Sequence, residues 1–228
     1  MSFKKYFIGR QANSFKNAVT LLALPKNAQL IRMEQVHGNK IVEIFDSSLN
    51  FEALSPLSGI DACYTTKKNT FLSVKSADCL PILISGFGTK NKTGIADEAE
   101  SFPFIAVAHA GRKSTETRIL FNLLEELNNR YDFVTSLKEK NKPLDIWFGP
   151  AICESCYQIN QETDIHYNLN AKNEQQVTEF FVKYDLDPEL SLNLEIENHC
   201  TLHEPEKYYS YRATGPGVQM NYSFIGIE

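Results

Sequence analysis

Apolar residues gather in short runs bounded by Gly, Pro and polar clusters, a pattern typical of buried β-strands. The most informative stretch is Phe71–Ile84, FLSVKSADCLPILI, in which two such runs flank an Asp78–Cys79 pair. Lys40–Phe45 follows Leu30–Val36 after a short His37-Gly38-Asn39 loop, which favours a β-hairpin. Further strands are predicted at Tyr6–Ile8, Val19–Leu24, Ile60–Thr65, Phe104–Ala108 and Leu144–Phe148.

Helical periodicity is clearest from Ser114 to Asn129. Apolar residues there recur on one face, at Ile119, Leu120, Leu123, Leu124 and Leu127. Ser114 or Thr115 is expected to cap the start. A second helix is predicted over Gln175–Tyr184, and the polar, glycine-rich residues 85–103 favour a loop. Strands outnumber helices, and no repeat or linker divides the sequence, so we predict one α+β domain over residues 1–228.

Composition narrows the setting. The 228 residues are 43% hydrophobic and 22% charged, as in an ordinary globular protein. A net charge of −5 argues against nucleic acid as a partner, although a local basic pocket would still serve a small anion. VTLLAL is too short to span a membrane, and no signal-peptide pattern is present. Five cysteines cannot all pair, so a reducing cytoplasm is expected.

Three potential metal ligands, His37, Cys79 and His109, lie far apart in sequence, each at the end of a predicted strand. Structural zinc sites usually show four ligands in closely spaced pairs. A three-ligand site with one open position, as in catalytic zinc, therefore fits this trio better. The alternative is two histidines in turns and a cysteine in the core.

A basic segment follows His109. Arg112 and Lys113 precede the predicted helix, whose free N–H groups could help to bind phosphate beside the metal. The alternative is that both are ordinary surface charges. Farther along, Tyr208–Arg212 offers aromatic rings and a guanidinium suited to a planar or anionic ligand, or forms an ordinary aromatic strand.

Two further groups contain cysteine. Cys153 and Cys156 have Cys-x-x-Cys spacing, which suggests a redox pair or a zinc knuckle, but no second pair completes a knuckle. We therefore expect no disulfide between them and no requirement for either in turnover. His199-Cys200-Thr201-Leu202-His203 could bind a metal, although packing and surface roles are the simpler interpretation.

Six motifs in order resemble the bacterial laccase-domain family, also called YfiH-like or purine nucleoside phosphorylase-like. They are QVHG (Gln35–Gly38), IDACYT (Ile60–Thr65), SADCLPI (Ser76–Ile82), AVAHAG (Ala106–Gly111), GPAI..CY (Gly149–Tyr157) and CT…YSYR..TG (Cys200–Gly215). The resemblance implies a layered α+β sandwich of mixed sheets flanked by helices. It also implies zinc binding by His37, Cys79 and His109. The chain departs from the family pattern at Arg112-Lys113-Ser114, where Trp-Arg-Gly is usual, and at Pro216, where Arg is usual.

The activity implied by the resemblance is phosphorolysis or deamination of purine nucleosides such as adenosine and inosine. Cys79, Asp61 and Asp78 form the expected catalytic set; the carboxylates would transfer protons or orient a ligand histidine. Arg212 would bind phosphate or ribose. The expected partners are a purine nucleoside and phosphate, with no nucleic acid or membrane, for a monomer or homodimer.

Members of the family are also described as copper-dependent polyphenol oxidases and as peptidoglycan editing factors. Two histidines and a cysteine also suit copper. Five histidines in the whole chain are too few for a cluster of several coppers. An editing role would be confined to cytoplasmic precursors. Zinc is therefore the expected cofactor, with copper as the alternative.

Overall fold

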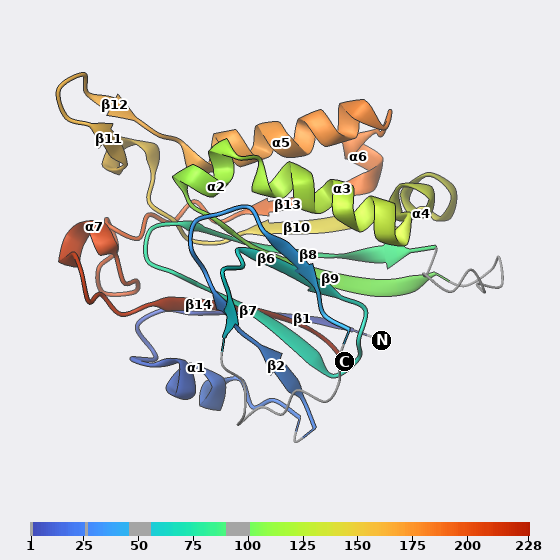
Figure 1. The fold of residues 1–228 in the computed structure, drawn as a ribbon, viewed down its shortest axis with the longest axis horizontal. Helices are drawn as coiled ribbons and strands as arrows, with labels where there is room; N and C mark the ends of the chain where they lie inside the picture. Colours follow the sequence, from blue (N-terminus) through green and yellow to red (C-terminus); the bar gives the residue numbers. More distant parts are fainter. Residues whose placement is uncertain (1, 26, 46–55, 90–100) are drawn as a thin grey trace.

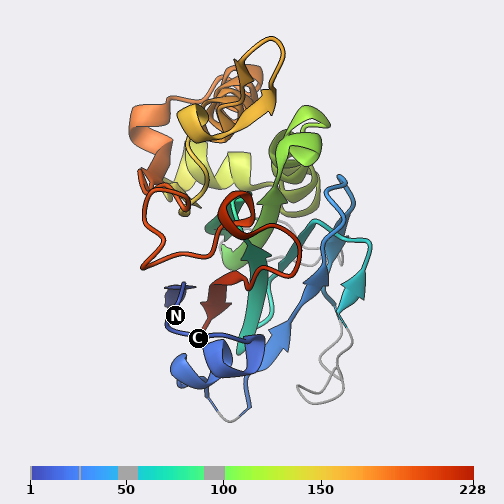
Figure 2. The same ribbon diagram turned by 90° about the vertical axis from the view of Figure 1, so that its left-hand side faces the viewer.

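Two β-sheets pack face to face in the computed structural model, which describes residues 2–25, 27–45, 56–89 and 101–228. Figure 1 shows one group of helices over the outer face of the larger sheet and a single helix, α1, below the smaller one. The view in Figure 2 shows the same layers from the side. The fold is a single-domain sandwich of mixed sheets with helices outside, as predicted.

The smaller sheet has the strand order β1 (Phe3–Ile8), β14 (Asn221–Ile227), β7 (Thr70–Ser76) and β2 (Gln29–Ile31). The larger sheet has the order β13 (Leu192–Ile196), β10 (Leu144–Phe148), β8 (Leu80–Gly88), β9 (Phe102–Ala110), β6 (Ala62–Thr65) and β4 (Ile41–Glu43). Two short pairs lie outside them: β3 (Met33–Glu34) with β5 (Leu57–Ser58), and β11 (Gln158–Asn160) with β12 (Ile165–His166).

The helices are α1 (Phe15–Leu21), α2 (Arg112–Glu116), α3 (Ile119–Tyr131), α4 (Phe133–Lys140), α5 (Leu169–Lys183), α6 (Pro188–Ser191) and α7 (Tyr211–Thr214), with a 3₁₀ turn η1 (Glu154–Cys156). No helix in the described part of the chain is both long and apolar enough to cross a membrane.

Strand β8 shows why the central run is apolar throughout. Side chains alternate across a sheet, so Ile82 and Ile84 pack into the core beneath α3–α5, whereas Leu83 packs between the two sheets. Both faces of β8 are therefore buried. The other strands predicted around it, β6, β7, β9 and β10, are present in the structure. All five apolar residues of the predicted helical face are buried in α3.

Two predictions about strands are wrong. Val19–Leu24 is not a strand; its first part is the end of α1, whose start is capped by the Ser14 side chain. The runs around the His37 loop do not form a hairpin, because β3 and β4 each pair in parallel with later strands, β5 and β6.

The predicted helix from Ser114 to Asn129 is two helices. It begins earlier, at Arg112, and is interrupted at Arg118, which has a φ of 63°. Ser114 does not cap it; its hydroxyl donates to the carbonyl oxygens of His109 and Gly111. Helix α5 is longer than predicted; it begins at Leu169 and is capped by Asn168, whose side chain accepts the Ala171 N–H. Of the predicted loop 85–103, residues 90–100 lie outside the described residues, and strands β8 and β9 occupy most of the rest.

Candidate metal centre and its cavity

A cavity of about 830 Å³ opens where β7, β8 and β9 end on the same side of the sandwich. His37, Cys79 and His109 line one part of it. Other parts are lined by the cations Lys75 and Arg212 and by the aromatic rings of Tyr157 and Tyr211. Its volume falls within the range typical of small-molecule sites.

The three predicted metal ligands meet in this cavity. Their ligand atoms all lie within 4.8 Å of one another. The Cys79 Sγ is 3.6 Å from His37 Nε2, and the two imidazole rings lie 4.7 Å apart between centroids. His37 comes from the loop after β3, Cys79 from the turn between β7 and β8, and His109 from the end of β9. His37 is exposed and His109 is buried, so the group faces solvent on one side.

Asp61 contacts two of these ligands, His37 and His109, from the buried side of the site. It is fully buried, and its carboxylate accepts the backbone N–H groups of Val36, His37 and Gly38 at 3.1, 2.9 and 2.8 Å. The same carboxylate lies 2.9 Å from the Nδ1 of His109. Because Nδ1 is engaged in this way, His109 has Nε2 left for a metal. Asp61 is therefore placed to hold the ligand loop and to orient the second histidine.

Gln35 anchors the other end of the same loop. Its side-chain amide donates to the Lys75 carbonyl oxygen at 2.7 Å and accepts the Lys75 N–H at 3.0 Å. These bonds imitate a strand pairing at the end of β7. Between the two anchors, His37 adopts a φ of 60°, which is uncommon for a residue other than glycine. The QVHG segment is thus fixed on both sides of its histidine.

Asp78 joins three segments around the cavity. It has a φ of 94°, a strained conformation at the turn before Cys79. Its carboxylate accepts the Thr201 hydroxyl at 2.6 Å and the Arg212 N–H at 2.7 Å, while its carbonyl accepts the Ile152 N–H at 2.9 Å. These bonds connect the Cys79 turn with the chain after β10 and with the start of α7.

The electrostatics of the trio favour the metal-binding form of Cys79. Burial raises the pKa of the Cys79 thiol, but the imidazoles of His109 and His37 more than offset this and lower that pKa to about 6. Burial lowers the pKa of His109, whereas Cys79 and Asp61 together raise it to about 9. Without a metal, the pair therefore favours a thiolate beside an imidazolium. The thiolate is the form of cysteine that binds metal ions.

The donor set fits one zinc ion. A cysteine and two histidines are three of the four ligands of a tetrahedral zinc, and the cavity leaves room for a fourth ligand from solvent or substrate. The backbone leaves space for these side chains only because residue 111 is glycine. A Cβ at Gly111 would lie 2.8 Å from His37 Cδ2 and 3.0 Å from Cys79 Sγ.

We expect Gly111→Ala to displace two ligands at once. The added methyl group would push against His37 and Cys79, so metal affinity should fall by about tenfold or more, within the range seen when ligand-orienting groups are lost. Competition with a chelator of known zinc affinity measures this change. Gly38→Ala is the matched control, because a Cβ there meets its nearest atom, an Asp61 carboxylate oxygen, at an ordinary 3.5 Å. Equal affinity in the two variants would contradict the steric argument.

The predicted anion-binding residues divide into two groups. Arg212 lines the cavity, and its Nη2 donates to the Gln158 carbonyl oxygen at 2.8 Å. Arg112 and Lys113 are not among the lining residues; Arg112 forms an ion pair with Glu116 at 3.5 Å, and Lys113 is exposed. Lys75, which the sequence analysis did not identify, lines the cavity instead. In the sequence, Lys75 could have been identified by its position as a lone cation directly after the FLSV run.

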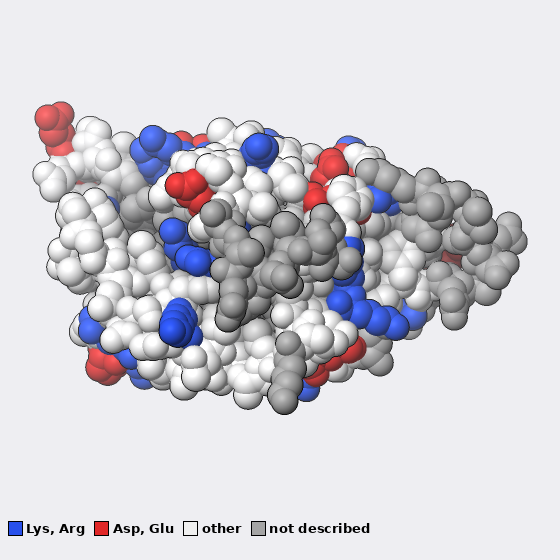
Figure 3. All heavy atoms as spheres, turned by 60° about the horizontal axis from the view of Figure 1, so that its bottom comes forward, with Lys and Arg blue, Asp and Glu red and all other residues white. Residues whose placement is uncertain are grey.

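Charge is dispersed on the surface that Figure 3 presents. Lys and Arg side chains lie there in separate groups, with Asp and Glu groups and uncharged surface between them.

Comparison with known proteins gives consistent matches. The model of a family described as multi-copper polyphenol oxidoreductase laccase matches residues 10–228. A Rickettsia conorii protein named purine nucleoside phosphorylase is 31% identical over 148 residues, or 64% of this chain and 50% of that protein, so the match spans half of its length. A Rickettsia prowazekii protein named purine nucleoside phosphorylase is 28% identical over 216 residues, covering 89% of this chain and 78% of that protein. A protein named adenosine deaminase, from an unknown prokaryotic organism, is 26% identical over 178 residues, or 72% of this chain and 59% of that protein.

Solved structures share the fold. The Bacillus licheniformis protein YfiH superposes with a TM-score of 0.66 at 20% identity, covering 93% of this chain and 79% of that one. YlmD from Geobacillus stearothermophilus gives a TM-score of 0.66 at 18% identity, covering 93% and 78%. The sandwich of two sheets is therefore common to these proteins.

Proposed function

We propose that this chain, which belongs to the family described as multi-copper polyphenol oxidoreductase laccase, cleaves purine nucleosides with inorganic phosphate. The observation that carries the proposal is that His37, Cys79 and His109 meet at a cavity with both cationic and aromatic walls. The names of the two Rickettsia relatives support the class of substrate.

In phosphorolysis, a phosphate oxygen bonds to C1′ of the ribose as the bond from C1′ to the purine nitrogen breaks. The bonding electrons leave with the purine, which takes up a proton. Lys75 and Arg212 would bind the phosphate by charge-assisted hydrogen bonds, and Tyr157 and Tyr211 offer flat surfaces for the base. A zinc ion held by the trio would supply a Lewis acid that polarises an oxygen of the reactants.

We assign Asp61 and Asp78 to positioning. The Asp61 carboxylate already accepts three backbone N–H groups and contacts His109. Both oxygens of Asp78 accept hydrogen bonds, from Thr201 and from Arg212. Each carboxylate therefore stabilises the shape of the site, and Cys79 serves as a metal ligand beside them.

Product analysis tests the proposed function. Inosine with phosphate should yield hypoxanthine and ribose 1-phosphate, and omission of phosphate should abolish both. Metal analysis of protein purified without added metal should find zinc in preference to copper. Oxygen-dependent oxidation of phenols by a copper-containing protein, without nucleoside cleavage, would instead support the polyphenol oxidase that the family description names.

Deamination of adenosine is proposed as a second activity of the same cavity. Its support is the relative named adenosine deaminase. The reaction replaces the amino group at C6 with an oxygen from water and releases ammonia, so it needs no phosphate. Ammonia release that is unchanged by phosphate would distinguish it from phosphorolysis in one assay.

We expect Lys75→Ala and Arg212→Ala each to raise the KM for phosphate by about tenfold or more. A hydrogen bond to a charged group contributes about 1.5–3 kcal/mol, which corresponds to at least that factor. Steady-state kinetics with phosphate varied at saturating inosine measures the change. The KM for adenosine in deamination should move less, because that reaction uses no phosphate.

Lys113→Ala is the control for the loss of a cation, since Lys113 is exposed and does not line the cavity. Its KM for phosphate should stay within about twofold of the unmodified protein, as expected for a surface charge. A larger increase in the KM for phosphate in Lys113→Ala than in Lys75→Ala would indicate that phosphate binds at the segment that begins at Arg112.

A further inference from the structure

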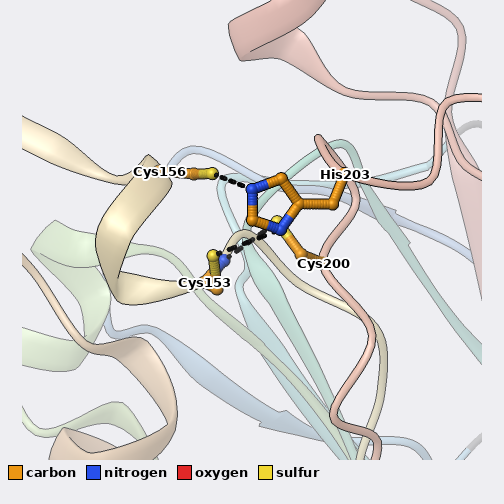
Figure 4. Close-up of side chains that lie close together, drawn as sticks. All are labelled: Cys153, Cys156, Cys200 and His203. Atoms are coloured by element: carbon orange, nitrogen blue, oxygen red, sulfur yellow. Dashed lines mark hydrogen bonds between the residues drawn. The ribbon is translucent and has the colours of Figure 1, made fainter.

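A second group of metal-binding side chains lies outside the cavity. Cys153 precedes the 3₁₀ turn η1 after β10 and Cys156 is its last residue, while Cys200 and His203 lie at the start and end of a turn after β13. Figure 4 shows the four side chains pointing toward one another. Their ligand atoms all lie within 4.8 Å of one another. None of the four lines the cavity of the first site.

We propose that these four residues bind a structural zinc ion. Three cysteines and one histidine are an established ligand set for such sites. The spacing also fits, because Cys153-x-x-Cys156 is joined by Cys200-x-x-His203, so each segment contributes two ligands three residues apart. The expectation that no second pair completes the Cys-x-x-Cys was therefore wrong: the fold supplies a pair with histidine in place of one cysteine.

The distances suit one ion. His203 lies between two sulfurs, with Nε2 3.0 Å from Cys156 Sγ and Nδ1 4.0 Å from Cys153 Sγ. Tetrahedral zinc, with bonds of about 2.0–2.3 Å, requires ligand atoms roughly 3.5–3.8 Å apart. A change of no more than about 1.3 Å along any edge would therefore form the site, outward at the 3.0 Å edge between His203 and Cys156 and inward at edges near the 4.8 Å limit.

The backbone already supports such a site. The Cys153 N–H donates to Cys200 Sγ at 3.4 Å, a bond that would also stabilise a metal-bound thiolate. A β-bridge between Ala151 and the ligand residue Cys200 holds the two segments together at the site. The two pairs are thus brought together by main-chain contacts as well as by their side chains.

A metal uses this group more completely than a disulfide does. All five cysteines of the chain are free. Any disulfide within the group would leave the third cysteine and His203 without a role, whereas one ion engages all four. Four protein ligands also close the coordination shell, which is typical of structural rather than catalytic zinc.

The site would fix one wall of the catalytic cavity. Tyr157 follows Cys156 directly and lines that cavity, as do Tyr211 and Arg212 a few residues after His203. Arg212 bonds to the Gln158 carbonyl oxygen, which connects the two segments again at the cavity. Loss of the ion should therefore raise the KM for the nucleoside about three- to tenfold, with a smaller change in kcat, because the walls move but the trio remains.

Metal content measured by mass spectrometry tests the site. The unmodified protein, loaded with zinc and then desalted, should hold about two zinc ions per chain. His203→Ala should hold about one, and His203→Cys should restore about two, since four thiolates also bind zinc. His199→Ala is the matched control: this exposed histidine belongs to the same HCTLH segment but contacts Glu197 and Glu204, and it should retain both ions.

Two further measurements separate this site from the first. Cys79→Ala should lose one zinc and keep the other, whether or not the protein cleaves nucleosides. Cobalt in place of zinc should give strong thiolate-to-cobalt charge-transfer absorption, which His203→Ala should reduce and Cys79→Ala largely retain.

Three results would overturn the proposal. The first is His203→Ala with a normal circular dichroism spectrum and undiminished zinc. The second is Cys79→Ala that is folded but holds no zinc. The third is a Cys153–Cys156 disulfide in protein isolated with zinc and without reductant. Because the His203 side chain is exposed, its substitution should leave the rest of the fold intact.

Discussion

Cys79→Ala should abolish most of the catalytic activity while leaving the protein folded. The substitution removes one of three ligands from an open metal site, so the metal loses both affinity and geometry. Substitution of groups that only orient ligands typically costs 10–100-fold, and loss of a ligand itself should lower kcat by more than about 100-fold. Single-turnover kinetics and zinc analysis on the same sample would measure the two effects together.

The matched control is Cys63→Ala. Cys63 is also a free cysteine, but it is fully buried between the two sheets, and burial raises the pKa of its thiol strongly. Its loss should create only a small cavity and leave zinc content and kcat near those of the unmodified protein. If Cys79→Ala kept both its zinc and its activity, the assignment of the metal centre would be wrong.

The sequence contains much of the information for this centre. His37, Cys79 and His109 each stand where an apolar run ends, and strand ends on one side of a sheet meet in space. The run on each side of Cys79 predicts its strands well, because β8 is buried on both faces and must be apolar throughout. The fold class follows from the same alternation of short runs and one long helical face.

The local pattern of apolar residues does not show which distant segments pair with each other. Nothing in Leu30–Phe45 shows that its strands find parallel partners in β5 and β6 rather than each other. The run from Val19 to Leu24 is apolar enough for either structure. It becomes helical because Ala18 and Leu22, four residues apart, are buried together in the core beneath the smaller sheet.

The second group of ligands was missed for a related reason. A search for Cys-x-x-Cys pairs identifies Cys153 and Cys156, but Cys200 and His203 lie more than forty residues later in the chain. The pairing of β13 beside β10 and the bridge between Ala151 and Cys200 bring them together. Lys75 is a similar case, because its place at the cavity depends on where β7 ends relative to the loop held by Gln35.

Asp61→Asn should have the largest effect on stability of any single substitution in the site. The new side chain has nearly the same shape, but its NH₂ group cannot accept hydrogen bonds and would face backbone N–H groups or His109. Removing one partner of a buried charged pair costs about 3–5 kcal/mol in the free energy of unfolding. Zinc affinity should also fall by about 10–100-fold, because His37 and His109 lose their common support.

The pKa of Asp61 determines how this loss of stability depends on pH. Burial raises the pKa of Asp61, but His109 and the N–H groups of Gly38 and Val36 together hold it below the ordinary value of 3.8. A carboxyl group with a lowered pKa stabilises the fold fully above its unfolded pKa and loses that contribution as pH falls through the folded pKa. The difference in stability between the metal-free unmodified protein and Asp61→Asn should thus be largest between about pH 5 and 6.5, and it should shrink in strong acid. It should also shrink as pH rises through the pKa of His109 near 9, because Asp61 helps to raise that pKa and its pairing with the imidazolium is then lost.

Urea denaturation at a series of pH values measures that difference, with Asp145→Asn as control. Asp145 lies on β10 and is only partly buried, accepting hydrogen bonds from the Asn193 and Ser85 side chains. Its substitution should cost less than about 1 kcal/mol, as expected for a partly exposed hydrogen bond. Equal losses in the two variants, or an Asp61→Asn protein whose zinc affinity is unchanged, would show that Asp61 does not hold the two histidines in place.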